Sequence, residues 1–322
     1  MRYALLLAGL VAALPAAAQA PAQSPTVEPP APVRRGVEPP SSPATGPVDE
    51  AFAAYQQGRY LTALHFATER AGTGDRAAMT LLGELYLRGL GVAPNPARAA
   101  DWYRLAADRG DREAQAALGV LLARGEGVTQ DTAEALRHLE AAAEAGHVQA
   151  AYNAALIHLN AEPPDDAAAA RHLARASESG NRDAIYALAQ LTRAGRGVPP
   201  DQRRATALLR EAGERGLLEA QVEYAIRLYR GEGIERDEGE AAVWFSRAAE
   251  RGNPIAQNRL ARILFAGRAS TRDPAEAAKW HIIARAAGLA DPELEHELLL
   301  LTRAERAEAD RRVVNWYARQ GP

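Results

Sequence analysis

The sequence predicts an all-α fold in which helical hairpins stack end to end. Three observations support this prediction. Glycine pairs of the form Gly-x-Gly recur at a fixed spacing, a short polar residue recurs at a fixed offset after them, and aromatic residues make up only 6% of a chain that is 47% apolar. A repeated unit whose apolar positions are mostly alanine favours closely packed helices over a β core.

The glycine pairs begin at Gly89, Gly125, Gly195 and Gly231, and a degenerate copy follows at Gly267. Neighbouring copies are 36 residues apart, except for one gap of 70 residues. That gap predicts a hidden copy two residues shorter, around the stretch LNAEPPDDAAAARHL. A single Gly-x-Gly could cradle a phosphate, but copies that recur in register indicate a turn.

Residues 1–18 are predicted to be a signal peptide. Arg2 precedes an apolar run from Ala4 to Leu14, and small residues follow. The run has about 11 residues, too few to cross a hydrocarbon core of about 30 Å. Cleavage fits after either Ala18 or Ala20, so we expect a periplasmic or secreted protein with no membrane span after cleavage.

Residues 19–48 are predicted to be a disordered linker, because they are rich in proline and poor in large apolar side chains. Residues 49–73 are predicted to form an N-terminal half-repeat. The chain contains no cysteine. It therefore has no disulfide and cannot be a lipoprotein anchored through an N-terminal cysteine.

Residues 74–288 are predicted to form six hairpins. The first helix of the first hairpin carries Ala78, Leu82, Gly83 and Tyr86, which fall on one stripe of a helix with 3.6 residues per turn. The small residues in this stripe let the partner helix approach closely. The Gly-x-Gly turn ends the first helix, because glycine adopts positive φ without a Cβ clash.

A short polar residue then starts each second helix, since its side chain accepts from free backbone N–H groups. These predicted N-caps are Asn95, Asp131, Asp201, Asp237 and Asp273. Each second helix repeats an alanine and aromatic pattern and closes on a glycine. The closing glycines are Gly110, Gly146, Gly180, Gly216, Gly252 and Gly288.

The combined pattern A-x-x-x-L-G-x-x-Y-x-x-G-x-G-V, an Asp or Asn, and then A-x-x-W-Y-x-x-A-A-x-x-G resembles the Sel1-like repeat, a relative of the tetratricopeptide repeat. The resemblance covers residues 74–288 as six units and implies a right-handed α-solenoid. The third unit departs from the pattern, since it lacks the glycine pair and has His172 at a tryptophan position. Many secreted members pair cysteines within each repeat, which this chain cannot do.

Residues 289–322 leave the repeat phase and are expected to form C-terminal capping helices. Thr302 and Glu305 have the spacing of a capping box ahead of a helix that reaches Trp316. A helical pair here would cover the apolar face that the last repeat otherwise exposes to water.

No catalytic, cofactor or metal site is expected from the sequence. The stretch from His296 is one histidine short of a zinc motif, because Leu300 stands where the second histidine belongs. His138 and His172 occupy equivalent places, and packing at an aromatic position is favoured over a metal pair. Lys279 is the only lysine, and no serine precedes it by three residues, as a β-lactamase motif requires.

The binding surface is expected on the first helices, which line the concave side in solenoids of this kind. The candidates stand in the two positions before each Leu-Gly position, which we expect to lie outside the packing stripe. They are Tyr152, Asn153, Tyr186, Glu223, Asn258 and Arg259. Ordinary solvated helix residues are the equally weighted alternative. The Tyr-Asn pair is frequent at this place in the family, and both side chains can bond a peptide backbone.

Two functions remain open. The first is a non-catalytic, monomeric scaffold or adaptor in the bacterial cell envelope that binds a protein or peptide through its concave face. The second is an envelope enzyme or binder that acts on peptidoglycan or a β-lactam, as some family members have been described. The net charge of −3, with both signs interleaved, argues against nucleic acid as a partner.

Overall fold

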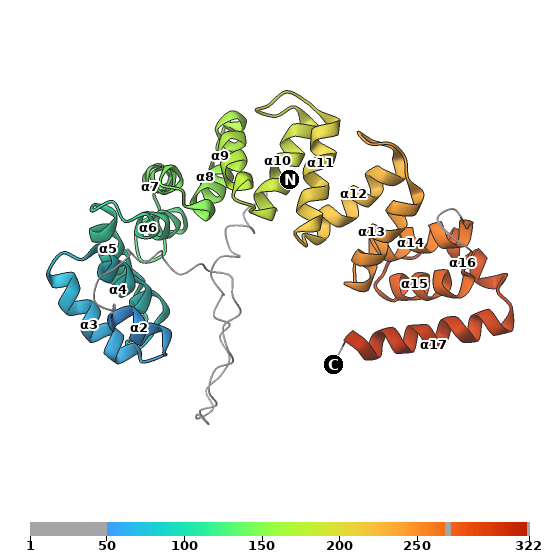
Figure 1. Ribbon diagram of the computed structural model, residues 1–322, viewed down its shortest axis with the longest axis horizontal. Helices are drawn as coiled ribbons and strands as arrows, with labels where there is room; N and C mark the ends of the chain where they lie inside the picture. Colours follow the sequence, from blue (N-terminus) through green and yellow to red (C-terminus); the bar gives the residue numbers. More distant parts are fainter. Residues whose placement is uncertain (1–49, 268–271, 321–322) are drawn as a thin grey trace. The chain divides into compact units, whose positions relative to one another are not determined.

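The protein is described by a computed structural model in which residues 50–267 and 272–320 are placed (Figure 1). Within these residues every regular element is a helix, which confirms the predicted all-α fold. The predicted signal peptide and linker lie outside the described residues. The sixteen helices are α2 (Glu50–Gln56), α3 (Tyr60–Gly72), α4 (Arg76–Arg88), α5 (Pro96–Ala107), α6 (Arg112–Arg124), α7 (Thr132–Glu144), α8 (Val148–Asn160), α9 (Asp166–Glu178), α10 (Arg182–Ala194), α11 (Gln202–Glu214), α12 (Leu218–Arg230), α13 (Glu238–Glu250), α14 (Pro254–Ala266), α15 (Pro274–Ala286), α16 (Pro292–Leu299) and α17 (Arg303–Gln320).

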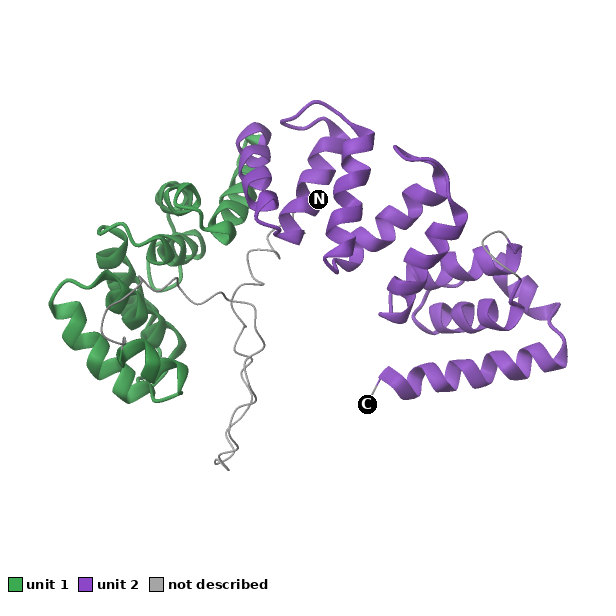
Figure 2. Ribbon diagram, viewed as in Figure 1, with its two compact units in different colours: residues 1–165 green, residues 166–322 purple. Residues whose placement is uncertain are grey.

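The chain divides into two compact units, residues 1–165 and 166–322 (Figure 2). The division falls between α8 and α9, inside the repeat that lacks the glycine pair. In unit 1, α4 packs on α5 and α6 packs on α7 as hairpins. In unit 2, the hairpins are α10 with α11, α12 with α13, and α14 with α15. We call the even-numbered helices from α4 to α14 the first helices and their odd-numbered partners the second helices.

The predicted helix caps are present. The side chain of Asp131 accepts from the backbone N–H of Glu134 at the start of α7, and Asp237 does the same for Glu240 at the start of α13. Gly125 ends α6 in the left-handed region with φ 67°, and its N–H binds the carbonyl of Leu121. The glycine and Asp/Asn signals were therefore read correctly as the two sides of a turn.

The second glycine of each turn has a further role that the sequence did not reveal. A Cβ placed on Gly127 would lie 2.3 Å from the carbonyl carbon of Pro96, the first residue of α5 in the preceding hairpin. A Cβ on Gly233 would lie 2.3 Å from the carbonyl oxygen of Gln202 at the start of α11. These glycines permit backbone-to-backbone contact between consecutive hairpins.

Inside a hairpin, the glycine of the Leu-Gly pair lies against the second helix. A Cβ on Gly83 would lie 2.5 Å from the ring of Tyr103, and a Cβ on Gly119 would lie 2.7 Å from Leu139. The Tyr103 hydroxyl donates to Glu84, the residue after this glycine, at 3.2 Å. This close approach confirms the role predicted for the small residues in the first-helix stripe.

The C-terminal helices depart from the hairpin arrangement. α17 packs on α15, while α16 lies against α14 and α15 (Figure 1). The predicted capping box is present, because the Thr302 hydroxyl accepts from the N–H of Glu305 while the Glu305 carboxylate accepts from the N–H of Thr302. The helix reaches Trp316, as predicted, and ends at Gln320.

Candidate binding site on the first helices

In unit 2, the structure brings together two of the predicted site residues, Tyr186 of α10 and Glu223 of α12. The Glu223 carboxylate accepts a hydrogen bond from Nε2 of Gln190, at 2.5 Å, and lies near enough to the Tyr186 hydroxyl to act on its pKa. The other amide atom of Gln190, Oε1, accepts from Nε and Nη2 of Arg193, at 3.2 Å and 2.9 Å. We call these four residues the Tyr186–Glu223 network.

One member of the network, Tyr186, has a shifted pKa. Partial burial and the neighbouring Glu223 carboxylate raise the pKa of Tyr186 to about 12. The phenol therefore stays neutral at neutral pH. Since Glu223 and Gln190 orient each other across two hairpins, their polar atoms are positioned before any ligand arrives.

Arg193 is the exposed end of the network, and Tyr186, Gln190 and Glu223 are half-buried. The surface thus offers guanidinium donors, an amide and a partly accessible carboxylate beside an aromatic ring. These groups suit recognition of peptide N–H and C=O groups, which need both donors and acceptors.

Arg227 of α12 lies beneath this surface and was missed by the sequence analysis. Its side chain is buried, and Nη1 donates to Oε1 of Gln202 and Oγ1 of Thr206, at 3.2 Å and 3.0 Å. Burial lowers the pKa of Arg227, an effect that the nearby Glu223 opposes. The equivalent position is Leu191 in the preceding repeat, so a comparison of repeat positions could have found this arginine.

The remaining predicted site residues lie elsewhere. Tyr152 and Asn153 of α8 in unit 1 are buried, and Asn153 accepts from Nε2 of Gln149 at 3.1 Å. Asn258 of α14 is also buried, whereas Arg259 beside it is exposed. The expectation that all six residues lie outside the packing is therefore wrong for three of them. A first helix packs against helices on both sides. The face that stays accessible to solvent is therefore narrower than the repeat positions alone predict.

The burial of Asn258 has a specific cause. Its Nδ2 donates to Asp291, the N-cap of α16, at 2.7 Å, and Arg262 donates to the same carboxylate through two nitrogens, at 2.7 Å and 2.8 Å. Burial alone would raise the pKa of Asp291, but the hydrogen bonds from Arg262 and Asn258 outweigh it and lower the pKa to about 2. Asn258 thus anchors α16.

Lys279 and His138, which were considered as catalytic or metal-binding residues, make contacts that stabilise the fold. Lys279 is buried on α15, and its ammonium lies 2.9 Å from Glu276 and 3.7 Å from the centre of the Trp280 ring. His138 is half-buried beside Glu134, and burial lowers its pKa. In the part of the chain that is described, no helix has both the length and the apolar character to cross a membrane.

Comparison with known proteins extends these observations. A family model described as "Sel1 repeat" matches six consecutive segments of the chain. The segments are residues 76–111, 112–147, 148–181, 182–217, 218–253 and 254–289. They include the short third repeat, whose two-residue deletion was predicted from the glycine spacing. No curated protein matches the chain.

Two solved structures support the same assignment. A Sel1 repeat protein from Oxalobacter formigenes is 28% identical, with a TM-score of 0.60 over 74% of this chain and 97% of that chain. The protein c5321, a protective antigen present in uropathogenic Escherichia coli strains and displaying an SLR fold, is 25% identical, with a TM-score of 0.52 over 83% of this chain and 67% of that chain. Since the repeat model matches well over half of the sequence in register with the helical hairpins, this chain belongs to the Sel1 repeat family.

Proposed function

We propose that this protein is a non-catalytic scaffold or adaptor in the bacterial cell envelope that binds a protein or peptide partner through its first helices. Sel1 repeat proteins generally mediate protein–protein interaction. The observation that carries the proposal for this chain is the Tyr186–Glu223 network, which holds donors and acceptors in fixed positions on neighbouring first helices.

The partner is an extended peptide segment whose backbone bonds Gln190 and Arg193. Tyr186 supplies apolar area with one polar tip beside the Glu223 carboxylate. Preorganised polar groups cost less to immobilise on binding than flexible ones. The absence of a strong net charge on the chain, which is −3, favours a partner recognised by hydrogen bonds rather than by long-range attraction.

The test starts with capture of the partner from an envelope extract by the mature chain, followed by titration of the purified partner. A triple variant, Tyr186→Phe with Gln190→Ala and Arg193→Ala, removes the polar groups of the network other than the Glu223 carboxylate. Each lost hydrogen bond contributes about 1 kcal/mol, so affinity should fall by more than about tenfold. Circular dichroism checks that helicity is unchanged.

A matched control lies on a second helix. Arg210 and Glu214 of α11 form an exposed hydrogen-bonded pair at 2.8 Å. The double variant Arg210→Ala with Glu214→Ala removes an interaction of the same type outside the proposed face. If it weakens binding as much as the triple variant does, the first-helix proposal is wrong.

The proposed location depends on residues 1–18 acting as a signal peptide. N-terminal sequencing of the protein recovered from a periplasmic fraction should give a mature chain that begins after Ala18 or Ala20. Recovery of the uncleaved chain in the cytoplasm alone would contradict the envelope location.

The same mature chain tests the enzymatic alternative. We expect no hydrolysis of a chromogenic β-lactam and no retention on peptidoglycan, because the ammonium of Lys279 is held by Glu276 and cannot serve a serine nucleophile. Turnover above the buffer rate would favour the enzyme instead.

A further inference from the structure

The last helix, α17, carries the Trp-Tyr pair of a second helix at the repeat spacing. Trp244, Trp280 and Trp316 are spaced 36 residues apart, which is the length of a repeat. Trp316 is followed by Tyr317, as Trp102 is followed by Tyr103 in the first repeat. These two residues thus keep the repeat spacing, although the matches to the repeat model end at residue 289.

In every complete repeat, the position equivalent to Tyr317 is buried. The equivalent residues are Tyr103, Leu139, Leu173, Leu209, Phe245 and His281, and each is at most 2% exposed. In the first two repeats this side chain lies against the glycine of its own first helix, as Tyr103 lies against Gly83 and Leu139 against Gly119, and the equivalent position in the other four repeats is alanine. At this position the second helix of a hairpin packs against its own first helix.

In the C-terminal pair, formed by α16 and α17, the equivalent position is exposed. α16 has only 8 residues, whereas α14 has 13, and α17 packs on α15 (Figure 1). Tyr317 is 47% exposed and Val314, one turn earlier, is 67% exposed. Ala278, which stands 36 residues before Val314, is fully buried. We call the surface formed by Val314 and Tyr317 the open face of α17.

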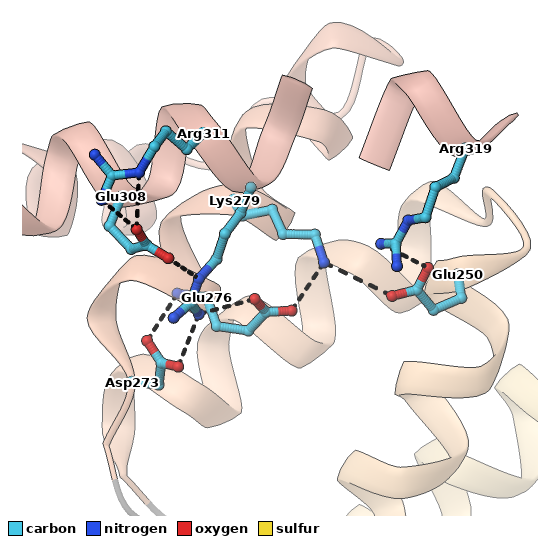
Figure 3. Close-up of polar contacts among 8 residues, drawn as sticks. Glu250, Asp273, Glu276, Lys279, Glu308, Arg311 and Arg319 are labelled. Atoms are coloured by element: carbon cyan, nitrogen blue, oxygen red, sulfur yellow. Dashed lines mark hydrogen bonds and ion pairs between the residues drawn. The ribbon is translucent and has the colours of Figure 1, made fainter. Parts of the chain in front are cut away.

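The open face lies on a helix that is firmly held from the other side. Trp316 packs edge-on against Trp280, with ring centres 6.1 Å apart, and its Nε1 donates to Glu250 at 3.1 Å. Ion pairs of α17 add to this contact, since Arg312 pairs with Glu276 of α15 and Arg319 pairs with Glu250 of α13 (Figure 3). The face is therefore presented in a fixed orientation and does not need to be ordered on binding.

We propose that the open face of α17 binds an amphipathic helix of a partner protein, in the way that a second helix binds its own first helix. The complete hairpins show what such a helix must carry. It needs a small residue opposite Tyr317, because Gly83 stands there against Tyr103, with a leucine before it. It also needs an acceptor directly after the small residue, because Glu84 accepts from the Tyr103 hydroxyl.

The chain itself supplies a probe with this chemistry. A synthetic peptide of residues 75–89, DRAAMTLLGELYLRG, contains the Leu-Gly-Glu sequence of α4. With Arg76→Glu and Thr80→Lys in the peptide, the two side chains condense with loss of water to a lactam that holds the peptide helical, since a short helix is otherwise marginal in water. Fluorescence anisotropy of the labelled peptide, titrated with the full chain, measures binding directly.

We expect saturable binding that Tyr317→Ala weakens by about tenfold or more. A peptide with Gly83→Leu should lose binding to a similar extent, because its side chain would collide with the Tyr317 ring. Val243→Ala is the matched control in the protein, since Val243 is also an exposed apolar residue on a second-type helix and lies away from α17 in sequence. This control should bind the peptide as the unmodified chain does.

Three outcomes would overturn the proposal. One is the absence of saturable binding, and another is binding that Tyr317→Ala leaves unchanged although circular dichroism shows an intact fold. The third is a dimer of the full chain in sedimentation velocity that Tyr317→Ala dissociates, because a second copy would then fill the face. Loss of the network on α10 and α12 affects none of these readouts, so this proposal and the proposed function can fail independently.

Discussion

The first hairpin and the C-terminal pair carry the same Trp-Tyr sequence, yet they place the tyrosine in opposite environments. Tyr103 is buried against Gly83, whereas Tyr317 is half-exposed on α17. The difference lies in the helix that precedes each one. α4 has 13 residues with a Leu-Gly pair, and α16 has 8 residues without one. A second-helix sequence therefore closes a hairpin only when a first helix of sufficient length and with a small residue is available.

The two regions also differ in what holds the helix. In the first hairpin, apolar packing buries Ala99, Ala100, Tyr103, Ala106 and Ala107 of the 12 residues in α5. In α17, only Ala309 and Trp316 of 18 residues are buried, and side-chain ion pairs supply much of the remaining contact with α15. We therefore expect the first hairpin to be stabilised mainly by burial and the last helix to respond more strongly to charge and salt.

The largest expected effect compares the two tyrosines directly. Tyr103→Ala should lower the free energy of unfolding by about 3–5 kcal/mol, because it leaves a cavity beside Gly83. Tyr317→Ala should cost less than about 1 kcal/mol, because the ring is already half in water. Urea unfolding followed by circular dichroism measures both values. Equal losses would contradict the view that only Tyr103 has a first helix to pack against.

The next comparison separates two requirements for glycine in the regular hairpins. Gly127 and Gly110 both have positive φ, of 71° and 75°, but only Gly127 lies against the backbone of Pro96. Gly110→Ala should cost about 1 kcal/mol, from backbone strain alone. Gly127→Ala adds a steric overlap with Pro96 and should cost about 2–4 kcal/mol.

Urea unfolding of the two glycine variants is the measurement, with the unmodified chain as reference. If Gly110→Ala proves as costly as Gly127→Ala, strain dominates and the contact between consecutive hairpins contributes little. The C-terminal pair has no such glycine between α16 and α17, which is consistent with its different packing.

A third prediction concerns the start of the C-terminal pair. The pKa of Asp291 is about 2 in the folded chain and about 3.8 when it is unfolded, so its contribution to stability is fully present above pH 3.8 and is lost as the pH falls through 2. The contribution should be about 2 kcal/mol. Asp291→Asn should remove it at neutral pH while keeping a residue that can cap α16.

The measurement is the urea midpoint of both chains at pH 7 and at pH 2. We expect the unmodified chain to be more stable than Asp291→Asn at pH 7, and the difference should shrink at pH 2. Asp183→Asn, at an exposed position of α10, serves as a control for the general effect of removing a carboxylate. A difference between the chains that does not change with pH would rule out the titration of Asp291 as its source.

The sequence predicted the hairpins well because their signals are local. A glycine at Gly125 with a capping aspartate at Asp131 fixes both sides of a turn, and the same pair recurs in register. The contact of Gly127 with Pro96 was not predictable in this way, because it joins two hairpins. The position of α17 was not predictable from local sequence either. Its Trp-Tyr sequence predicts packing against a full-length first helix, and α16 is too short to provide one.

The candidate site was predicted less completely for a related reason. Repeat positions identified Tyr186 and Glu223, and the structure joins them in one network. The same positions in α8 and α14 place Tyr152, Asn153 and Asn258 in buried surroundings. Which side of a first helix stays accessible depends on the helices beside it, and in the case of Asn258 on Asp291 in α16, which lies outside the repeats.

The smallest expected effect tests whether ion pairs between helices hold α17, using two adjacent arginines. Arg312 donates to Asp273 at 2.8 Å and to Glu276 at 3.0 Å, both at the start of α15, as well as to Glu308. Arg311 contacts Glu308 within its own helix (Figure 3). Arg312→Gln should therefore lower the free energy of unfolding by about 1 kcal/mol, since it leaves carboxylates at the start of α15 without their partner. Arg311→Gln should lower it by only about 0.3 kcal/mol.

The loss caused by Arg312→Gln should become smaller when the urea unfolding is repeated at high salt, because the interaction is partly exposed and is screened. Equal, salt-independent losses of stability in the two variants would show that only the burial of Trp316 and Ala309 holds α17. The C-terminal pair and the first hairpin would then be stabilised by the same type of interaction, apolar burial, and would differ only in how much surface is buried.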